Sequence, residues 1–260
     1  MKNITGLLLS MVLCTAIPSV AQDTFQKAQF ISAGDTLPYR ILLPINYDKT
    51  KTYPVVLFLH GAGERGTDNE KQLVHGSKQF LDSTNRRKFP AIVIFPQCAP
   101  NSYWSNVDIQ TDTSGARTFH FSLKEEPTRM MKLLVEFVKQ LPRQYKIVEN
   151  RFYVTGLSMG GMGTFEIVRR LPRRFAAALP ICGGADPASA ATIKHVPWWI
   201  FHGDKDNVVP ITHSEKMVNA LKAANATVKY NVYPNVGHNS WDNAFAEPDY
   251  LVWMFQQRRK

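Results

Sequence analysis

The sequence predicts an α/β fold, with a mostly parallel twisted sheet and helices on both of its faces. Two continuous apolar runs, 54–60 and 91–96, are typical of parallel strands that are buried on both sides. Helical patterns follow strand patterns along most of the chain, and this alternation favours a parallel sheet covered by helices. No repeat or change of composition divides the chain, so we expect one domain over residues 22–260.

Apolar spacing and turn residues place the other elements in order. Residues 28–33 and 39–43 are typical of two strands, with Gly34 and Asp35 in the turn between them. A helix is expected from Pro127, because apolar residues recur there three and four positions apart. The later strands are expected at 151–154, 175–181, 198–203 and 228–233, and the other helices at 69–82, 164–170, 211–223 and 249–257.

One long stretch, residues 97–125, has no clear period. Aromatic and histidine side chains stand among its polar residues, namely Tyr103, Trp104, Phe119, His120 and Phe121. A loop of this length inside a compact domain is usually functional or mobile. We therefore expect residues 97–125 to form a lid-like or substrate-facing insertion.

The first 21 residues are expected to be a signal peptide. Lys2 supplies a positive start, residues 4–17 are mostly apolar, and Ser19-Val20-Ala21 fits the small-x-small cleavage rule. The apolar run is too short to span a bilayer, and no other stretch is long and apolar enough to do so. We expect cleavage near Ala21-Gln22 and export to the periplasm or the extracellular space.

Charge and residue spacing argue against nucleic-acid binding, a metal site and a disulfide. The formal net charge is +10, mainly from scattered basic pairs, and no basic stripe with aromatic residues indicates nucleic acid. No set of potential ligands has metal-binding spacing, so we expect no metal and no cofactor. An exported protein could pair Cys98 and Cys182, but they follow strands expected about 14 Å apart, so we expect no disulfide unless the loops close that gap. No pattern indicates an oligomeric state.

A glycine-rich turn between an expected strand and an expected helix carries a serine. Its core is Gly156-Leu157-Ser158-Met159-Gly160. In such a turn, side chains beside the serine would clash, and a strained backbone presents the hydroxyl above the edge of the sheet. Ser158 is therefore the candidate nucleophile.

An aspartate and a histidine follow later strands of the same expected sheet. Because ligands bind beyond the carboxyl ends of parallel strands, residues just after the strands can share one site. Ser158, Asp206 and His238 occur in that order, each after a strand. We expect His238 to accept the Ser158 proton and Asp206 to fix the imidazole tautomer. Asp204 and Asp242 are rival acids, and Asp206 is preferred because Asp204 lies within the tight turn itself.

Two backbone N–H groups should stabilise the negative oxygen that forms during attack by a serine. One is expected from Met159, directly after the nucleophile. The other is expected from the loop after the 54–60 strand, where Ala62 is the first choice and Gly63 the second.

Two tryptophans are candidates for contact with substrate, Trp104 and Trp241. Trp104 has an equal alternative role, in which it anchors its loop to the domain. His60 and His202 precede glycines at strand ends. Both are expected to hydrogen-bond locally.

Taken together, the motifs resemble secreted carboxylesterases of the α/β-hydrolase superfamily, close to the feruloyl and acetyl-xylan esterases of carbohydrate esterase family 1. The resemblance runs from about residue 30 to the end of the chain. It implies an α/β-hydrolase fold with Asp206 as the triad acid. The matching segments are His60-Gly61-Ala62-Gly63-Glu64-Arg65-Gly66, Pro96-Gln97-Cys98, Gly156-Leu157-Ser158-Met159-Gly160-Gly161, Phe201-His202-Gly203-Asp204-Lys205-Asp206, Val208-Val209-Pro210 and Gly237-His238-Asn239-Ser240-Trp241.

The expected function is therefore that of a secreted serine esterase. Its substrates would be feruloyl or acetyl groups on plant polysaccharide, or small aryl esters, cleaved through an acyl-enzyme. A prolyl-oligopeptidase-like serine peptidase is one alternative, although the chain has no room for the large gating domain usual in such enzymes. A non-catalytic glycan-binding protein on a hydrolase scaffold is the other, and the intact triad argues against it.

Overall fold

The structure is a computed structural model that describes residues 24–115 and 117–260. The signal peptide predicted at residues 1–21 and its cleavage site at Gln22 lie outside the described residues. Within the described ranges, every helix is too short or too polar to cross a bilayer.

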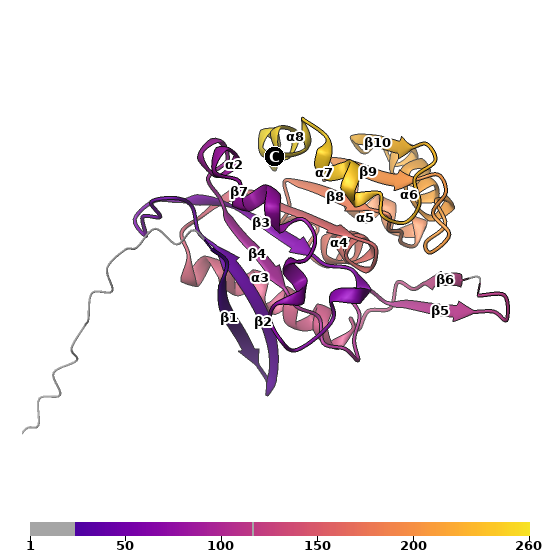
Figure 1. The fold of residues 1–260 in the computed structure, drawn as a ribbon, viewed down its shortest axis with the longest axis horizontal. Helices are drawn as coiled ribbons and strands as arrows, with labels where there is room; N and C mark the ends of the chain where they lie inside the picture. The colour runs from indigo at the N-terminus through magenta and orange to yellow at the C-terminus, as the bar shows by residue number, and fades with distance from the viewer. Residues whose placement is uncertain (1–23, 116) are drawn as a thin grey trace, which may run out of the picture.

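Eight strands of the described residues form one twisted sheet (Figure 1). Their order is β1-β2-β4-β3-β7-β8-β9-β10. The β1–β2 and β2–β4 pairs are antiparallel, and the pairs from β4 across to β10 are parallel. The predicted mostly parallel sheet is confirmed. The strands are β1 (Gln26–Ser32), β2 (Asp35–Leu42), β3 (Tyr53–Leu59), β4 (Ile92–Pro96), β7 (Ile147–Leu157), β8 (Ala177–Ile181), β9 (Trp198–Gly203) and β10 (Val228–Tyr233).

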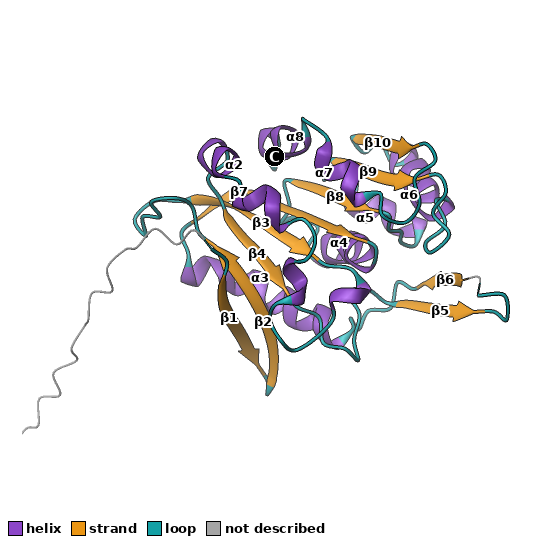
Figure 2. Ribbon diagram, viewed as in Figure 1, coloured by secondary structure: helices purple, strands orange, loops and turns teal. Residues whose placement is uncertain are grey.

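Helices pack on both faces of this sheet (Figure 2). One apolar core contains α3 (Arg129–Gln144), α4 (Met159–Arg170), α5 (Ala190–Ile193) and α6 (Thr212–Ala223). The opposite core contains α1 (Ser77–Leu81), α7 (Trp241–Ala246) and α8 (Tyr250–Gln256), with α2 (Ser83–Lys88) following α1. Along β3, Val55 and Leu57 enter the first core, whereas Val56 and Phe58 enter the second. This alternation explains why β3 is apolar throughout.

The helix predicted over 69–82 is wrong, because the segment is broken. A 3₁₀ turn at Lys71–Leu73 is followed by Gly76 with a φ of 76°, and α1 begins at the next residue. A Cβ at Gly76 would overlap the ring of Phe58, so this left-handed position requires glycine. The short helices α2, α5 and α7 are also absent from the predicted set, because their four to six residues show no clear period.

The 97–125 stretch contains two strands that its sequence did not predict. They are β5 (Val107–Thr111) and β6 (Arg117–Phe121), and they pair antiparallel. The resulting β5–β6 hairpin stands apart from the main sheet (Figure 2). Most of its positions are exposed or half-buried, which explains the weak apolar pattern.

The two cysteines of the described residues, Cys98 and Cys182, are free and buried. They follow β4 and β8, which β3 and β7 separate. The predicted absence of a disulfide between them is confirmed.

Candidate active site

Ser158 lies between β7 and α4, where it is the N-cap residue of the helix. Its backbone has φ 54° and ψ −117°, a conformation that residues with a side chain rarely adopt. Two backbone hydrogen bonds hold it there. The Ser158 N–H donates to the Ile181 carbonyl at 2.9 Å, and the Ser158 carbonyl accepts from Met162 N–H at 3.0 Å. This strained strand-to-helix turn has the geometry of a nucleophile elbow.

The glycines beside Ser158 are required by close contact between backbones. A Cβ at Gly156 would lie 2.5 Å from the carbonyl oxygen of Gly160 and 2.6 Å from that of Leu59. A Cβ at Gly160 would overlap the same Leu59 oxygen. Side chains at these positions would therefore clash, as the sequence predicts.

His238 follows β10 and reaches the hydroxyl of the elbow serine. Its Nε2 lies 2.9 Å from Ser158 Oγ, and its Nδ1 lies 2.7 Å from Asp206 Oδ2. The Trp241 ring packs edge-on against the imidazole, with ring centroids 5.4 Å apart. The structure thus brings the three predicted side chains into one hydrogen-bonded series.

Asp206 lies in the loop after β9, and its side chain is completely buried. Oδ1 accepts hydrogen bonds from the backbone N–H groups of Val208 and Val209, both at 2.9 Å. Burial would raise the pKa of this carboxyl, but hydrogen bonds from His202, His238 and the backbone outweigh it and hold the pKa well below its usual range. Asp206 is therefore an ionised acceptor facing the imidazole.

The two rival acids have other contacts. Asp204 is exposed and accepts a hydrogen bond from Asn235 N–H at 2.7 Å, which fixes the loop that leads to His238. Asp242 is exposed and accepts a weak hydrogen bond from the Asn239 side chain at 3.3 Å. The structure places Asp206 against the histidine in preference to either of them.

Two buried groups beside Asp206 were not identified as site residues from the sequence. His202 Nε2 lies 3.2 Å from Asp206 Oδ2, a contact with the candidate acid that the sequence did not predict. His60 also bonds beyond its neighbours, because its Nε2 accepts from Cys98 N–H. Cys182 Sγ lies within 4.8 Å of ligand atoms of both Asp206 and His238. His202 stands four residues before Asp206 at the end of β9, but this spacing alone does not show that the two side chains meet.

The Cys182–Asp206–His238 group has the donor atoms of a metal site, although the sequence showed no such spacing. Burial raises the pKa of the Cys182 thiol, so it stays protonated, whereas metals bind the thiolate. The Asp206 and His238 atoms are already hydrogen-bonded to each other. This chemistry fits a hydrogen-bonded series and not a metal site.

The candidate oxyanion donors come from two neighbouring strands. β3 and β7 are parallel, and Leu59 pairs with Gly156, so the loops that follow them emerge at one edge of the sheet. Met159 is the first residue of α4, and Ala62 begins the 3₁₀ turn (Ala62–Glu64) after β3. A Cβ at Gly61 would lie 2.9 Å from the Leu157 side chain, so this loop packs directly on the elbow. Met159 and Ala62 thus lie at the same edge of the sheet as Ser158.

Trp104 is fully buried, which contradicts its predicted contact with substrate. Its ring stands edge-on to His60, with centroids 5.5 Å apart. A Cβ at Gly163 would lie 2.5 Å from the Cβ of Trp104, so the tryptophan also packs tightly on α4. The alternative role, an anchor of the loop, accounts for this position.

The β5–β6 hairpin packs its apolar side beside the elbow. Phe119 forms a small buried cluster with Met162 of α4 and Val209 of the Asp206 loop, separate from the two main cores. The rings of Phe119 and Phe121 stand edge-on to His213, at 5.3 and 5.4 Å. The hairpin is thus an apolar wall next to the serine and the aspartate.

A groove of about 540 Å³ lies beside the same region. Arg65 lines it and donates from Nε to the Ala62 carbonyl at 3.0 Å. Tyr103 also lines it, and its hydroxyl lies 3.9 Å from Met162 Sδ. The groove therefore adjoins both the loop after β3 and the first turn of α4. Its other lining residues are mostly polar: Pro100, Asn101, Ser102, Ser105, Asn106, Val107, Asp108, His120, Ser122, Lys124, Thr128 and Arg129.

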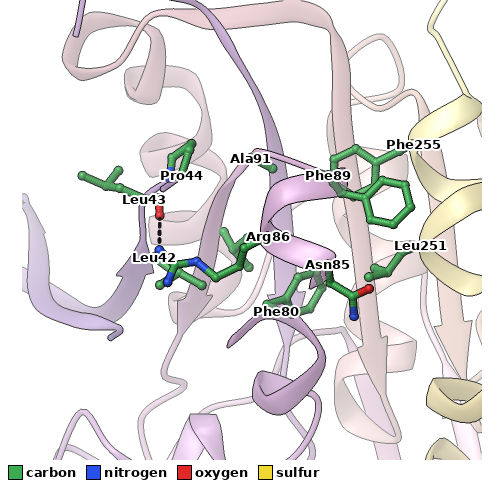
Figure 3. A pocket seen from close by; sticks show the side chains of 11 residues that line it. Leu42, Leu43, Pro44, Phe80, Asn85, Arg86, Phe89, Ala91, Leu251 and Phe255 are labelled. Atoms are coloured by element: carbon green, nitrogen blue, oxygen red, sulfur yellow. Dashed lines mark hydrogen bonds between the residues drawn. The ribbon is translucent and has the colours of Figure 1, made fainter. Parts of the chain in front are cut away.

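A second cavity, of about 20 Å³, lies remote from the serine, among the side chains of Figure 3. Its lining is mostly apolar and comes from the end of β2, from α1, α2 and α8, and from β4. The Arg86 guanidinium donates to the Leu43 carbonyl at 3.0 Å. This space contains none of the elbow, His238 or Asp206, and it is a gap in core packing.

The fold, the elbow and the strand-end histidine and aspartate define an α/β hydrolase. A comparison with protein families agrees, because residues 91–250 match the dienelactone hydrolase family. The chain belongs to this family. Ser158, Asp206 and His238 all lie within the matched range.

Two curated relatives are much longer than this chain. An uncharacterized secreted protein of Arthroderma benhamiae is 24% identical over 265 residues, which are 90% of this chain and 26% of that protein. A bifunctional acetylxylan esterase/xylanase of Neocallimastix patriciarum is 30% identical over 83 residues, which are 32% of this chain and 12% of that protein. The chain thus spans about a quarter of the first relative's length and less of the second's.

Two solved structures are similar in fold. A thermostable esterase is 35% identical and superposes with a TM-score of 0.81, covering 92% of this chain and 64% of its own. A carbohydrate esterase family 1 ferulic acid esterase from Anaeromyces mucronatus is 17% identical, with a TM-score of 0.62, covering 89% of each chain. The second likeness concerns the fold alone.

Proposed function

We propose that this protein is an exported serine esterase that hydrolyses carboxylic esters through an acyl-enzyme on Ser158. The observation that carries the proposal is the series of two hydrogen bonds, 2.9 Å from Ser158 Oγ to His238 Nε2 and 2.7 Å from His238 Nδ1 to Asp206 Oδ2. A serine hydroxyl is a weak nucleophile unless a base takes its proton during attack. The series supplies that base at the required distance.

The reaction follows from these positions. His238 Nε2 accepts the Ser158 proton as Oγ attacks the ester carbonyl carbon, and the carbonyl oxygen becomes negative. The N–H groups of Met159 and Ala62 donate to that oxygen. His238 then returns the proton to the leaving alcohol, which leaves an acyl-Ser158. A water attacks in the same manner and releases the acid.

Asp206 stabilises the imidazolium formed in each step. Its carboxylate stays ionised because its pKa lies below the usual range. It therefore holds the hydrogen on His238 Nδ1 and leaves Nε2 free to accept a proton from the serine.

The surroundings of Ser158 support an ester that joins an acyl group to a sugar. The half-buried side chains that pack on the Phe119 cluster, among them Val107, Ile109 and Phe121 of the hairpin, suit an aryl or alkyl acyl group. The adjoining groove of about 540 Å³ has the hydroxyl and amide side chains that suit a saccharide. The names of the acetylxylan esterase and ferulic acid esterase relatives favour feruloyl or acetyl groups on plant polysaccharide. On this proposal the 97–125 segment is the substrate-facing part of one catalytic domain.

Export is part of the proposal. Its support is the signal-like sequence of residues 1–21 and the secreted relative from Arthroderma benhamiae. Mass determination of the protein recovered outside the cytoplasm tests it. A start at Gln22 is expected, and retention of Met1 in the cytoplasm would contradict it.

The variant Ser158→Ala tests the catalytic assignment directly. Hydrolysis of p-nitrophenyl acetate should fall by about 10⁴-fold or more, with an unchanged circular dichroism spectrum. Ser83→Ala, at an exposed position in α2, is the matched control and should keep wild-type activity. Retention of most activity by Ser158→Ala would rule the mechanism out.

Substrate class is tested by comparing methyl ferulate, acetylated xylan and a peptide amide under one set of conditions. We expect both esters to be cleaved faster than the amide, because amide cleavage demands more protonation of the leaving group. Faster cleavage of the amide would favour the peptidase alternative. Binding of xylan without cleavage of any of the three would favour the non-catalytic one.

A further inference from the structure

His202 is a buried histidine that the mechanism above does not use. It lies in β9, and its side chain is completely buried. Its Nε2 is 3.2 Å from Asp206 Oδ2, the same oxygen that faces His238 Nδ1 at 2.7 Å. One carboxylate oxygen thus has an imidazole on each side.

The neighbours of His202 Nε2 decide where its hydrogen lies. Besides Asp206 Oδ2, this nitrogen is 2.9 Å from the carbonyl oxygen of Val209. A carbonyl oxygen and an ionised carboxylate are both acceptors only. Nε2 therefore carries a hydrogen, which it shares between the Val209 carbonyl and Asp206.

A second hydrogen-bonded group fixes the other side of the ring. His202 Nδ1 lies 2.7 Å from Ser214 Oγ, and Ser214 Oγ lies 2.9 Å from the carbonyl oxygen of Gly183. When Ser214 donates to Nδ1, the imidazole is neutral. When Ser214 donates to Gly183, Nδ1 must donate to Ser214 and the ring carries a positive charge. Both arrangements keep the Nε2 hydrogen directed at Asp206.

We propose that His202 is a positioning residue that orients Asp206 and weakens its pull on the His238 proton. The inference rests on the proposed function. Oδ1 is already held by the N–H groups of Val208 and Val209, so His202 fixes the remaining oxygen and stops the carboxylate from rotating. A carboxylate that accepts an extra hydrogen bond is less basic toward His238. His238 then returns its proton more readily to the leaving group.

Other titratable groups near this pair do not compete at neutral pH. Cys182, at the end of β8, is within reach of Asp206, and burial raises its pKa. His213 of α6 interacts with His202, and burial together with Lys216 lowers its pKa. Both are therefore uncharged at neutral pH. In a variant that lacks the His202 imidazole, the acidic limb of the pH profile can thus be assigned to His238.

A matched pair of variants distinguishes the contact of His202 with Asp206 from its contact with Ser214. His202→Asn places an amide near Ser214 and leaves Asp206 without its donor, whereas His202→Gln can direct an amide N–H at Asp206. For p-nitrophenyl acetate, we expect His202→Asn to lower kcat by about tenfold to a hundredfold, with little change in KM. The acidic limb of kcat/KM should move upward by about half a pH unit or more. His202→Gln should restore most of both.

The outcomes distinguish this inference from a purely structural role and from the proposed function. The exposed His195→Asn is the matched control and should match wild type. Wild-type kcat and an unmoved acidic limb in His202→Asn, with only a lower Tm, would overturn the inference. If His202→Asn fails to fold, nitrogen-15 NMR of the histidines in the wild-type enzyme decides, since an unprotonated His202 Nε2 would also overturn it. An active Ser158→Ala would instead remove the proposed function.

Discussion

The elbow around Ser158 and the β5–β6 hairpin lie against each other but are held in different ways. The elbow is fixed by backbone contacts, so close that Gly156 and Gly160 leave no space for a Cβ. The hairpin is held by a few apolar side chains around Phe119, and most of its strand positions are exposed or half-buried. One region is specified by its backbone and the other by side chains.

This difference fits a division of tasks. Acyl transfer requires reacting atoms to be placed within a fraction of an ångström, which a rigid, buried turn provides. Substrate selection depends on the size and polarity of a surface, which a peripheral hairpin can change without disturbing the sheet. Substitutions in the elbow should therefore abolish activity, whereas substitutions in the hairpin should change which substrate is preferred.

The largest effect is expected from Gly160→Ala. The new methyl group would overlap the Leu59 carbonyl oxygen, and neither backbone can move without disrupting β3 or α4. We expect loss of soluble, folded protein or of all detectable activity, measured by circular dichroism and ester hydrolysis. Gly115→Ala, in the hairpin, is the control, because its Cβ meets no atom although its φ is 86°. It should cost only about 1 kcal/mol, and an equal loss from both variants would contradict the comparison.

Asp206→Asn should lower kcat by about 10⁴-fold while leaving the fold intact. The amide can no longer hold the hydrogen on His238 Nδ1. The imidazole then carries its hydrogen on Nε2, which cannot accept the Ser158 proton. Asp204→Asn is the matched control, since Asp204 is exposed and its carboxylate accepts from the Asn235 backbone N–H, which an asparagine oxygen can also do. Steady-state kinetics with p-nitrophenyl acetate measure both. A comparable loss in the control would make Asp204 the acid.

Stability should depend on pH through His60, a buried histidine directly after β3. Burial lowers the pKa of His60 from 6.5 to about 4, and its Nε2 accepts from Cys98 N–H at 2.9 Å. Between these pH values the unfolded chain binds a proton that the folded chain does not. The free energy of unfolding therefore falls by about 3 kcal/mol as pH drops from 6.5 to 4.

Urea unfolding of wild type and His60→Gln at pH 7 and pH 4 measures the His60 contribution. The glutamine oxygen can still accept from Cys98, but it does not titrate. The loss of stability on acidification should therefore be smaller in the variant. Asp206 contributes in a separate pH range. Because its pKa is lowered in the folded protein, its ionised carboxylate stabilises the fold above about pH 3.8, and this contribution is lost as the pH falls below that value. If His60→Gln loses as much stability between pH 7 and pH 4 as wild type does, His60 is not the cause of the loss.

The smallest effect is expected from Phe119→Ala in the hairpin. Removing this ring loosens the wall beside Met162 and Val209 without touching the triad. KM for methyl ferulate should rise by about tenfold, with kcat for p-nitrophenyl acetate nearly unchanged. The exposed neighbour Thr118→Ala is the control and should change neither. Equal losses on both substrates would show that the hairpin supports the catalytic groups themselves.

The sequence predicted what depends on backbone regularity. The apolar run of β3 predicted a doubly buried strand, and the order of Ser158, Asp206 and His238 at strand ends predicted that they would meet. The turn at Ser158 could be identified because glycine is the one residue that fits positions 156 and 160.

What could not be predicted depends on side chains that meet only after folding. His202 precedes a glycine, as His60 does, and only the three-dimensional structure directs it at Asp206. Trp104 is aromatic within a polar loop, a pattern that fits a buried anchor as well as a binding surface. The hairpin has too few buried positions to give a strand pattern.

Covalent labelling tests the central claim, that Ser158 is the nucleophile, most directly. The protein would be treated with a fluorophosphonate, which reacts with serines activated by a neighbouring base, and the modified peptide would be identified by mass spectrometry. We expect one adduct per chain, on Ser158, with loss of esterase activity in step with labelling. Asp206→Asn should be labelled more slowly than wild type. Inactivation with the adduct on another residue, or full activity with Ser158 completely modified, would contradict it.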